Sequence, residues 1–317
     1  MASAGSSRLD SAGAANSVMA PKPIPAPSAY GTTTSTDAAL YWCRYGPAGA
    51  PRLLVLHGGP GAHHDYLLPQ MLEVTRAAGG RELLLYDQRG GGRSRTQDRD
   101  EITWRTQVAD VASVIREFGL EGAPLLGYSW GALLAMLFAA ESASDAALPR
   151  HGPLVLIDPA PATRQYRNEF EREFGRRQNA AEVVRMREEL AASGLRERDP
   201  QGYRQRNFEL SVAGYFADPR SATDLTPFRV TARVQQSVWE SLGDFDLIAD
   251  GRLAKIDAPA LVVHGRQDPI PLASSRAAAS AMNAELVVID DCGHVPYVEQ
   301  PDALWAAADR FLAATRP

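Results

Sequence analysis

The chain has 317 residues, of which 45% are apolar and 22% are charged, a composition typical of a globular protein that buries a substantial core. Its net charge of -5 at pH 7 argues against binding to nucleic acid or to an anionic membrane surface. Because the length exceeds what one compact core usually supports, we expect one large domain with an inserted subdomain.

Cysteine and lysine usage argue against several kinds of cofactor site. Cys43 and Cys292, the only cysteines, form no CxxC pair, so neither a disulfide framework nor a multi-thiolate zinc site is predicted. The only lysines, Lys22 and Lys255, do not belong to a glycine-rich phosphate loop. We therefore expect no cofactor and no metal.

Residues 1–29 are rich in Ala, Ser, Gly and Pro, and we interpret them as a flexible tail. They lack the apolar stretch of a signal peptide. No run of about 18 apolar residues occurs in the chain, so no membrane-spanning helix is predicted. These features favour a cytoplasmic protein without a membrane partner.

From residue 39 onward, short apolar runs alternate with longer helical patterns. This alternation predicts an α/β fold with a mostly parallel sheet and helices on both faces. The predicted strands cover 39–45, 52–57, 81–87, 123–128, 152–158, 258–264 and 284–290. Helices are predicted over 103–118, where Thr103 is a suitable N-cap and Gly119 follows the end, and over 130–142.

The alternation stops between residues 161 and 245. This stretch contains helical patterns rich in Arg and Glu, including 164–177 and 180–193, with a nearly balanced charge. Their outward faces are expected to be solvated and to carry local ion pairs. We predict an α-helical cap here, inserted into a core formed by residues 30–160 and 246–317.

The segment Gly127-Tyr128-Ser129-Trp130-Gly131 joins a predicted apolar strand to a predicted apolar helix. This is the context of a G-x-S-x-G nucleophile turn, in which glycines allow a sharp bend that exposes the serine hydroxyl. The five residues alone fit an ordinary strand-to-helix turn equally well. If Ser129 is a nucleophile, it needs a histidine base and a carboxylate that orients the base.

Asp268 follows the predicted strand 258–264, and His294 follows the next strand. The chain order Ser129, Asp268, His294 is the order of the α/β-hydrolase triad. His294 is also the only histidine after Asp268. Three other acids compete for the role of Asp268, namely Asp158, which follows another strand, and Asp290 and Asp291, which lie beside His294.

A second glycine-rich turn, His57-Gly58-Gly59-Pro60-Gly61, follows the predicted strand 52–57. Acyl transfer builds negative charge on a carbonyl oxygen, and backbone N–H groups stabilise that charge. The motif context nominates the amides of Gly59 and Trp130 as an oxyanion hole. His57 is expected to brace this loop, and Cys292 is interpreted as a packed thiol.

These motifs together resemble the proline iminopeptidase family of serine aminopeptidases within the α/β-hydrolase superfamily. The matching segments are HGGPG at 57–61, DQRGGGRS at 87–94, GYSWG at 127–131, GRQD at 265–268 and GH at 293–294. The chain has Tyr128 where the family usually has glycine. The resemblance implies an α/β-hydrolase fold with a helical cap, and removal of an N-terminal residue, often proline, from a short peptide.

Relatives with the same motifs cleave esters, amides or other acyl bonds in small metabolites. Recognition of a buried ammonium group requires carboxylates that face Ser129. Glu209 and Glu240 are the candidates because apolar and aromatic residues surround them in sequence, although both also fit the surface of an amphipathic helix. An apolar pocket without facing carboxylates would favour an esterase or amidase instead. A non-catalytic ligand-binding homologue is the third hypothesis.

Overall fold

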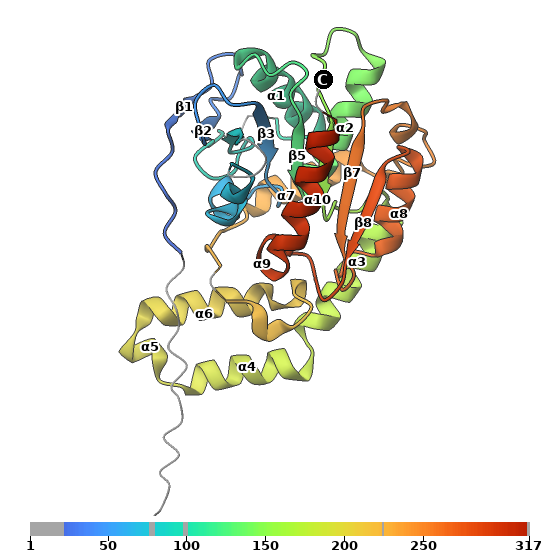
Figure 1. Cartoon of the computed structure of the whole chain (residues 1–317). Coiled ribbons are helices and arrows are strands. Elements are labelled where there is room, and N and C mark those ends of the chain that lie inside the picture. Colours follow the sequence, from blue (N-terminus) through green and yellow to red (C-terminus); the bar gives the residue numbers. More distant parts are fainter. Residues whose placement is uncertain (1–21, 76–79, 98–100, 224, 316–317) are drawn as a thin grey trace, which may run out of the picture.

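The computed structural model describes residues 22–75, 80–97, 101–223 and 225–315. One sheet of eight strands, in the order β1-β2-β4-β3-β5-β6-β7-β8, forms its centre (Figure 1). The strands are β1 (Ala29–Thr32), β2 (Tyr41–Tyr45), β3 (Arg52–Leu56), β4 (Glu82–Tyr86), β5 (Leu125–Tyr128), β6 (Leu154–Ile157), β7 (Ala260–Gly265) and β8 (Glu285–Ile289). The pairs β1–β2 and β2–β4 are antiparallel and all other pairs are parallel. The seven strands predicted from the sequence are confirmed.

The central strands are apolar along their length because both faces of the sheet are covered. Successive side chains of a strand point to opposite faces, so each strand feeds two cores. Leu54 and Leu56 of β3 pack in one core with α1 (Trp104–Glu117), α2 (Trp130–Ser144) and α8 (Leu272–Ala281). Leu53 and Val55 pack in the other core with α10 (Pro301–Ala314) and the 3₁₀ helices η1 (His64–Leu67) and η2 (Gln70–Thr75).

The two helices predicted in the core are confirmed, and their ends follow the expected local rules. The Thr103 side chain accepts a hydrogen bond from the Thr106 backbone at the start of α1 and forms a capping box with it. Gly119, just after α1, adopts φ 57°. Among the described helices, none is long and apolar enough to cross a membrane.

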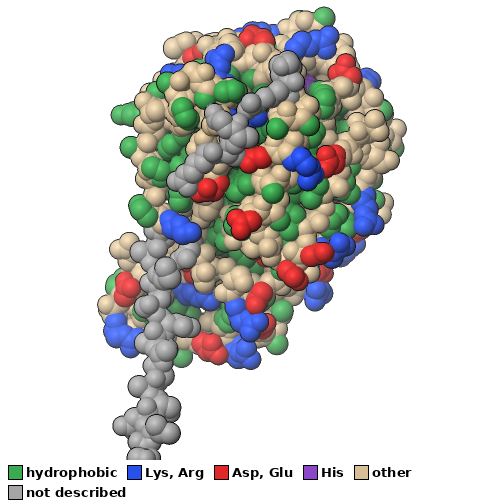
Figure 2. All heavy atoms as spheres, in the orientation of Figure 1, with side chains coloured by type: hydrophobic (Ala, Val, Ile, Leu, Met, Phe, Trp, Pro, Cys, Tyr) green, Lys and Arg blue, Asp and Glu red, His purple; other side chains and the backbone are tan. Residues whose placement is uncertain are grey.

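The connection between β6 and β7 contains the helices of residues 161–245, which we call the helical segment. They are α3 (Arg164–Gln178), α4 (Ala181–Ala192), α5 (Leu195–Arg198), α6 (Pro200–Val212), η3 (Ala213–Tyr215), η4 (Pro219–Ser221) and α7 (Ala232–Leu242). Helices α4, α5 and α6 form a layer beyond one end of the sheet (Figure 1). Charged side chains of both signs lie on the surface of this part (Figure 2), and they include the ion pairs Arg176–Glu173 and Arg185–Glu189.

The sequence analysis did not predict strand β1. It pairs only with β2, in the register Ala29 with Arg44, and its Tyr30 is 68% exposed. An edge strand with one partner needs no apolar alternation, and the sequence AYGT offers none. Ala29, assigned to the tail, therefore belongs to the sheet, while residues 1–21 of the predicted tail lie outside the described residues.

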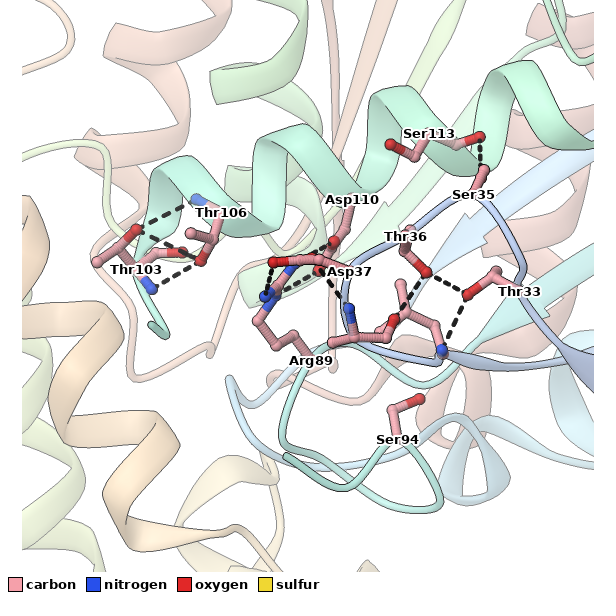
Figure 3. A network of polar contacts seen from close by, with 12 residues as sticks. Thr33, Ser35, Thr36, Asp37, Arg89, Ser94, Thr103, Thr106, Asp110 and Ser113 are labelled. Atoms are coloured by element: carbon pink, nitrogen blue, oxygen red, sulfur yellow. Dashed lines mark hydrogen bonds and ion pairs between the residues drawn. The ribbon is translucent and has the colours of Figure 1, made fainter. Parts of the chain in front are cut away.

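A buried arginine connects the loop after β4 to α1 and to the loop after β1 (Figure 3). Arg89 is 4% exposed and donates two hydrogen bonds to Asp110, from Nε at 2.9 Å and from Nη2 at 2.6 Å. Its Nη2 also donates to Asp37 at 2.6 Å. Burial raises the pKa of Asp110 to about 6, and the hydrogen bonds from Arg89 oppose that rise. The arginine therefore holds a buried carboxylate in its charged form.

We predict that Arg89→Met lowers the free energy of unfolding by about 3–5 kcal/mol, because it leaves the Asp110 carboxylate buried without a partner. Urea unfolding at pH 7 measures this loss. Asp37→Asn is the matched control, since Asp37 is exposed and its contact with Arg89 is worth about 1 kcal/mol or less. Equal losses in both variants would contradict this account.

The start of α2 lies directly against the end of β3. A Cβ atom at Gly131 would overlap the backbone carbonyl of Leu56, so only glycine fits there. We predict that Gly131→Ala lowers the free energy of unfolding by more than about 2 kcal/mol, as an overpacked site does. Gly175→Ala on α3 is the control, because no atom lies within 4 Å of its added Cβ. Thermal and urea unfolding measure the loss of stability in both variants. Equal losses in the two variants would refute the prediction.

Candidate active site

Ser129 occupies the sharp turn between β5 and α2. Its φ of 55° is unusual for a residue other than glycine, and such strained residues are held by their surroundings. The Ser129 backbone N–H donates to the Ile157 carbonyl at 2.9 Å, and its carbonyl accepts from Ala132 and Leu133. A Cβ at Gly127 would lie 2.5 Å from the Cα of Ala132, so the turn is closely packed.

The structure brings Ser129, His294 and Asp268 together from the loops that follow β5, β8 and β7. Ser129 Oγ lies 3.0 Å from His294 Nε2, and His294 Nδ1 lies 2.7 Å from Asp268 Oδ2. Asp268 Oδ1 accepts a hydrogen bond from the Ile270 backbone at 2.7 Å. The hydroxyl, imidazole and carboxylate therefore form a continuous hydrogen-bonded chain.

His294 is held by contacts from the core and from the helical segment. The Tyr128 hydroxyl donates to the His294 carbonyl at 2.8 Å, which gives a role to the residue that departs from the family pattern. The His294 backbone N–H donates to the Tyr215 carbonyl at 2.7 Å, and the Tyr215 ring stacks on the imidazole. Burial lowers the pKa of His294 to about 4, so the imidazole is neutral and able to accept a proton at pH 7.

The competing acids lie in two different environments. Asp290 and Asp291 are exposed, and Asp290 pairs with Arg266 at the surface. Asp158 is fully buried at the end of β6, where its Oδ1 accepts from the Gly265 backbone at 2.8 Å. Of these acids and Asp268, Asp268 is the one that makes a hydrogen bond to His294.

Two other expectations concern residues near the site. His57 Nε2 accepts from the Gln88 backbone at 3.0 Å, and the His57 carbonyl accepts from the Gln88 side chain at 2.7 Å, so this histidine braces its loop as expected. Cys292 is buried, its Sγ lies 3.5 Å from the Gly293 carbonyl, and burial raises the pKa of the thiol. The sulfur therefore behaves as a packed thiol.

Gly59 and Trp130 line the same cavity as Ser129. Gly59 adopts φ 122°, and a Cβ there would lie 2.7 Å from that of Ala62. Its loop is fixed by the Tyr66 hydroxyl, which accepts from the Gly58 backbone at 2.7 Å. Within the described ranges, the backbone N–H groups of Gly59 and Trp130 have no protein acceptor. Their role as oxyanion donors is part of the proposed function.

The cavity above Ser129 has a volume of about 360 Å³ and lies between the sheet and the helical segment. Most of its lining is apolar or aromatic. The helical segment contributes Phe170, Phe174, Phe208, Tyr215, Phe216, Phe228 and Trp239, and the core contributes Tyr66, Tyr128, Trp130 and Tyr297. The volume fits a small ligand with an apolar group.

The cavity has one ion pair in its described lining. Glu171, its only carboxylate, lies 2.7 Å from Arg167, whose guanidinium stands 3.7 Å above the centre of the Trp239 ring. Glu171 is 52% exposed and belongs to an Arg- and Glu-rich pattern that the sequence analysis assigned to a solvated face. Nothing in that pattern distinguishes Glu171 from its exposed neighbours, so sequence reasoning missed it.

The structure does not bring Glu209 and Glu240 to the cavity, contrary to the expectation that they face Ser129. Glu209 is buried, but it accepts hydrogen bonds from Gln205 at 2.8 Å and from Arg206 at 3.0 Å. Glu240 is exposed and accepts from Gln236 at 2.7 Å. The rotation of α6 and α7 turns both carboxylates away, and Phe208 and Trp239 beside them enter the cavity instead.

In the described part of the chain, Asp158, His264 and Asp268 form a cluster with metal-ligand spacing. Each offers one ligand atom, and the three atoms lie within 4.8 Å of one another. Most of their donor and acceptor atoms already have protein partners, because Asp268 contacts His294 and Ile270, and His264 Nδ1 lies 2.9 Å from the Ser275 hydroxyl. We therefore assign no metal to these residues.

Comparison with known proteins agrees with the geometry. The profile of the family described as "Alpha/beta hydrolase family" matches residues 53–308. A proline iminopeptidase of Lactobacillus delbrueckii subsp. bulgaricus is 24% identical over 267 residues, which cover 78% of this chain and 85% of that protein. A proline iminopeptidase of Levilactobacillus brevis is 26% identical over 281 residues, which cover 83% and 88%.

Among solved structures, the crystal structure of proline iminopeptidase from Mycobacterium smegmatis superposes with a TM-score of 0.65. The two sequences are 21% identical, and the match covers 90% of this chain and 98% of that one. This similarity shows the fold, and the family profile spans most of the chain. On the strength of its sheet and of that profile match, the chain belongs to the alpha/beta hydrolase family.

Proposed function

We propose that the protein is a serine hydrolase that acts through an acyl-enzyme formed on Ser129. The observation that carries this proposal is the unbroken chain of hydrogen bonds from Ser129 Oγ through the imidazole of His294 to Asp268. In the first step His294 Nε2 takes the hydroxyl proton while Oγ attacks the substrate carbonyl carbon. Asp268 orients the imidazole and stabilises its protonated form.

The rest of the cycle follows from the same groups. The backbone N–H groups of Gly59 and Trp130 donate to the oxygen of the tetrahedral intermediate. His294 then passes its proton to the leaving group, and the acyl group stays on Ser129. Water enters, His294 takes one of its protons, and a second intermediate collapses to release the acid and restore the hydroxyl.

The cavity favours an ester or amide with a small apolar acyl group as substrate. Its lining is mostly apolar or aromatic, and the charge of its one described carboxylate, Glu171, is balanced by Arg167 at 2.7 Å. A free ammonium group placed there would lose its hydration without an unpaired carboxylate. We also propose that the helical segment of residues 161–245 acts as a cap, because it supplies most of this aromatic wall.

An aminopeptidase of proline iminopeptidase type is the second candidate. It is favoured by the similarity to proline iminopeptidases over about four-fifths of the chain. In this case the Glu171 carboxylate would move away from Arg167 and pair with the N-terminal ammonium of the substrate instead. An aromatic wall also suits a proline ring, since aromatic faces pack well against apolar groups.

One experiment tests the reaction and distinguishes the two substrates. We predict that the protein hydrolyses a short p-nitrophenyl ester and that Ser129→Ala lowers kcat by about 10³-fold or more, because the nucleophile is lost. Glu171→Gln should alter ester turnover less than about threefold. Steady-state absorbance assays with the ester and with a proline arylamide measure both effects.

Proline arylamide turnover that Glu171→Gln reduces by tenfold or more would support the aminopeptidase instead. Ester turnover that survives in Ser129→Ala would refute the proposed mechanism. Binding of both compounds without turnover by the parent protein would indicate the non-catalytic homologue.

On the acid side of the pH profile, kcat/KM should fall at a pH well below the usual pKa of histidine. His294 acts as a base only when neutral, and burial lowers its pKa to about 4, whereas an unperturbed histidine has 6.5. We predict that kcat/KM for the ester is unchanged between pH 7 and about pH 5.5 and falls as pH approaches 4. Thermal unfolding over the same pH range separates this loss from acid denaturation. An acid limb at or above pH 6.5 would contradict the argument.

A further inference from the structure

A second carboxyl group lies behind Asp268 in the interior. Asp158 directly follows β6 and adopts φ 40°, an unusual value for a residue other than glycine, and its side chain has no exposed surface. Its Oδ1 accepts a hydrogen bond from the Gly265 backbone at 2.8 Å, which fixes the orientation of the carboxyl group. In the proposed mechanism Asp268 is the only carboxylate that contacts His294, and the Asp158 carboxyl group has no role.

The two carboxyl groups are close neighbours in the interior. One oxygen of Asp158 and one oxygen of Asp268 belong to a cluster of ligand atoms that all lie within 4.8 Å of one another. Two buried carboxylates at this distance repel each other strongly, so one of them carries a proton. The pair then has one negative charge, as in other sites where two carboxyl groups hold one proton.

The surroundings decide which carboxyl group holds the proton. Asp268 accepts hydrogen bonds from the Ile270 backbone and from His294 Nδ1, and both favour its anion. Asp158 accepts one, from Gly265, and within the described residues its Oδ2 has no N–H or O–H donor. Burial raises the pKa of Asp158 well above its usual range, and the hydrogen bond from Asp158 opposes the rise that burial causes in the pKa of Asp268.

We propose that Asp158 is a positioning residue, which stays protonated and donates a hydrogen bond from Oδ2 to the Asp268 carboxylate. This inference rests on the proposed function, because Asp158 acts on the reaction only through Asp268 and His294. The donated hydrogen bond holds the Asp268 carboxylate in the orientation that receives His294 Nδ1–H. It also stabilises the anion, and so lowers the proton affinity of the Asp268–His294 pair.

Other titratable and charged groups also face the pair. They are His264 on β7, Cys292 and His294 after β8, Glu299 on α9 (Pro296–Glu299), Arg177 on α3, and Tyr128, Tyr215 and Tyr297. His264 lies 3.6 Å from Asp158 Oδ1, but burial lowers its pKa to about 3, so the ring is neutral. Arg177 and Glu299 carry opposite charges, so they do not replace a hydrogen bond donated directly to Asp268.

The test compares Asp158→Leu with Asp158→Asn. Leucine removes the donor, whereas the asparagine amide N–H still donates to Asp268 and its oxygen still accepts from Gly265. Removal of a donor from a buried carboxylate should raise the acid limb of kcat/KM by about one pH unit and lower kcat by about tenfold or more. Asp158→Asn should keep the limb within about 0.3 pH units of the parent and lower kcat by less than about fivefold.

The control is Asp290→Asn, which removes an exposed carboxylate from the loop that carries His294 and should leave the whole pH profile unchanged. A shift of the acid limb to lower pH in both Asp158 variants would overturn the proposal, because it would show that Asp158 is ionised in the parent. An unchanged limb in Asp158→Leu would overturn it as well. If Asp158→Leu does not fold, Asp158→Asn decides the question: an acid limb within about 0.3 pH units of the parent supports the proposal, and a shift of the limb to lower pH overturns it.

A measurement without turnover separates this proposal from the proposed function. The infrared difference spectrum between the parent and Asp158→Asn at pH 7 should contain the carbonyl stretch of a protonated carboxylic acid, assigned by its shift in D₂O. Absence of that band would overturn the proposal whether or not the protein hydrolyses the ester. Presence of the band without hydrolysis of any substrate tested would refute the proposed function and leave the protonation of Asp158 established.

Discussion

The close contact between the start of α2 and the end of β3 is the constraint on which the candidate site depends. Gly131 lies so near the Leu56 carbonyl that no side chain fits between them. This close approach adjoins the sharp turn after β5, where Ser129 adopts φ 55° and lines the cavity. Trp130, the first residue of α2, lines the same cavity as Gly59. The close packing at Gly131 thus lies next to the residues proposed as nucleophile and oxyanion donor.

Burial gives the polar groups of the site their chemistry. The His294 imidazole is 4% exposed, so it is neutral at pH 7 and ready to take a proton. The same burial prevents two neighbouring carboxyl groups from both being charged, and the donors around Asp268 and Asp158 determine which one holds the proton. A polar cluster of this kind is stable only when nearly every member has a partner. The backbone of Ile270 and Gly265 supplies part of that pairing.

The helical segment contributes both to the cavity and to the position of His294. It provides most of the aromatic wall of the cavity and anchors His294 through the Tyr215 carbonyl. Several of its charged residues form ion pairs with each other on the outer surface, including Arg176–Glu173 and Arg185–Glu189. The ion pair of Arg167 and Glu171 belongs to the lining of the cavity, so it lies within reach of a group bound there.

The sequence by itself determined the features that rest on local patterns. Apolar runs identified seven of the eight strands, and the glycine-rich turns with the order Ser129, Asp268, His294 identified the residues that the structure brings together. Strand β1 was not predicted because its short sequence, AYGT, contains no apolar run. Only the tertiary structure decided that Glu209 and Glu240 turn away from the cavity, since a helix rotation of a fraction of a turn has no signature in composition. The pairing of Asp158 with Asp268 likewise depends on two distant strands lying side by side in the sheet.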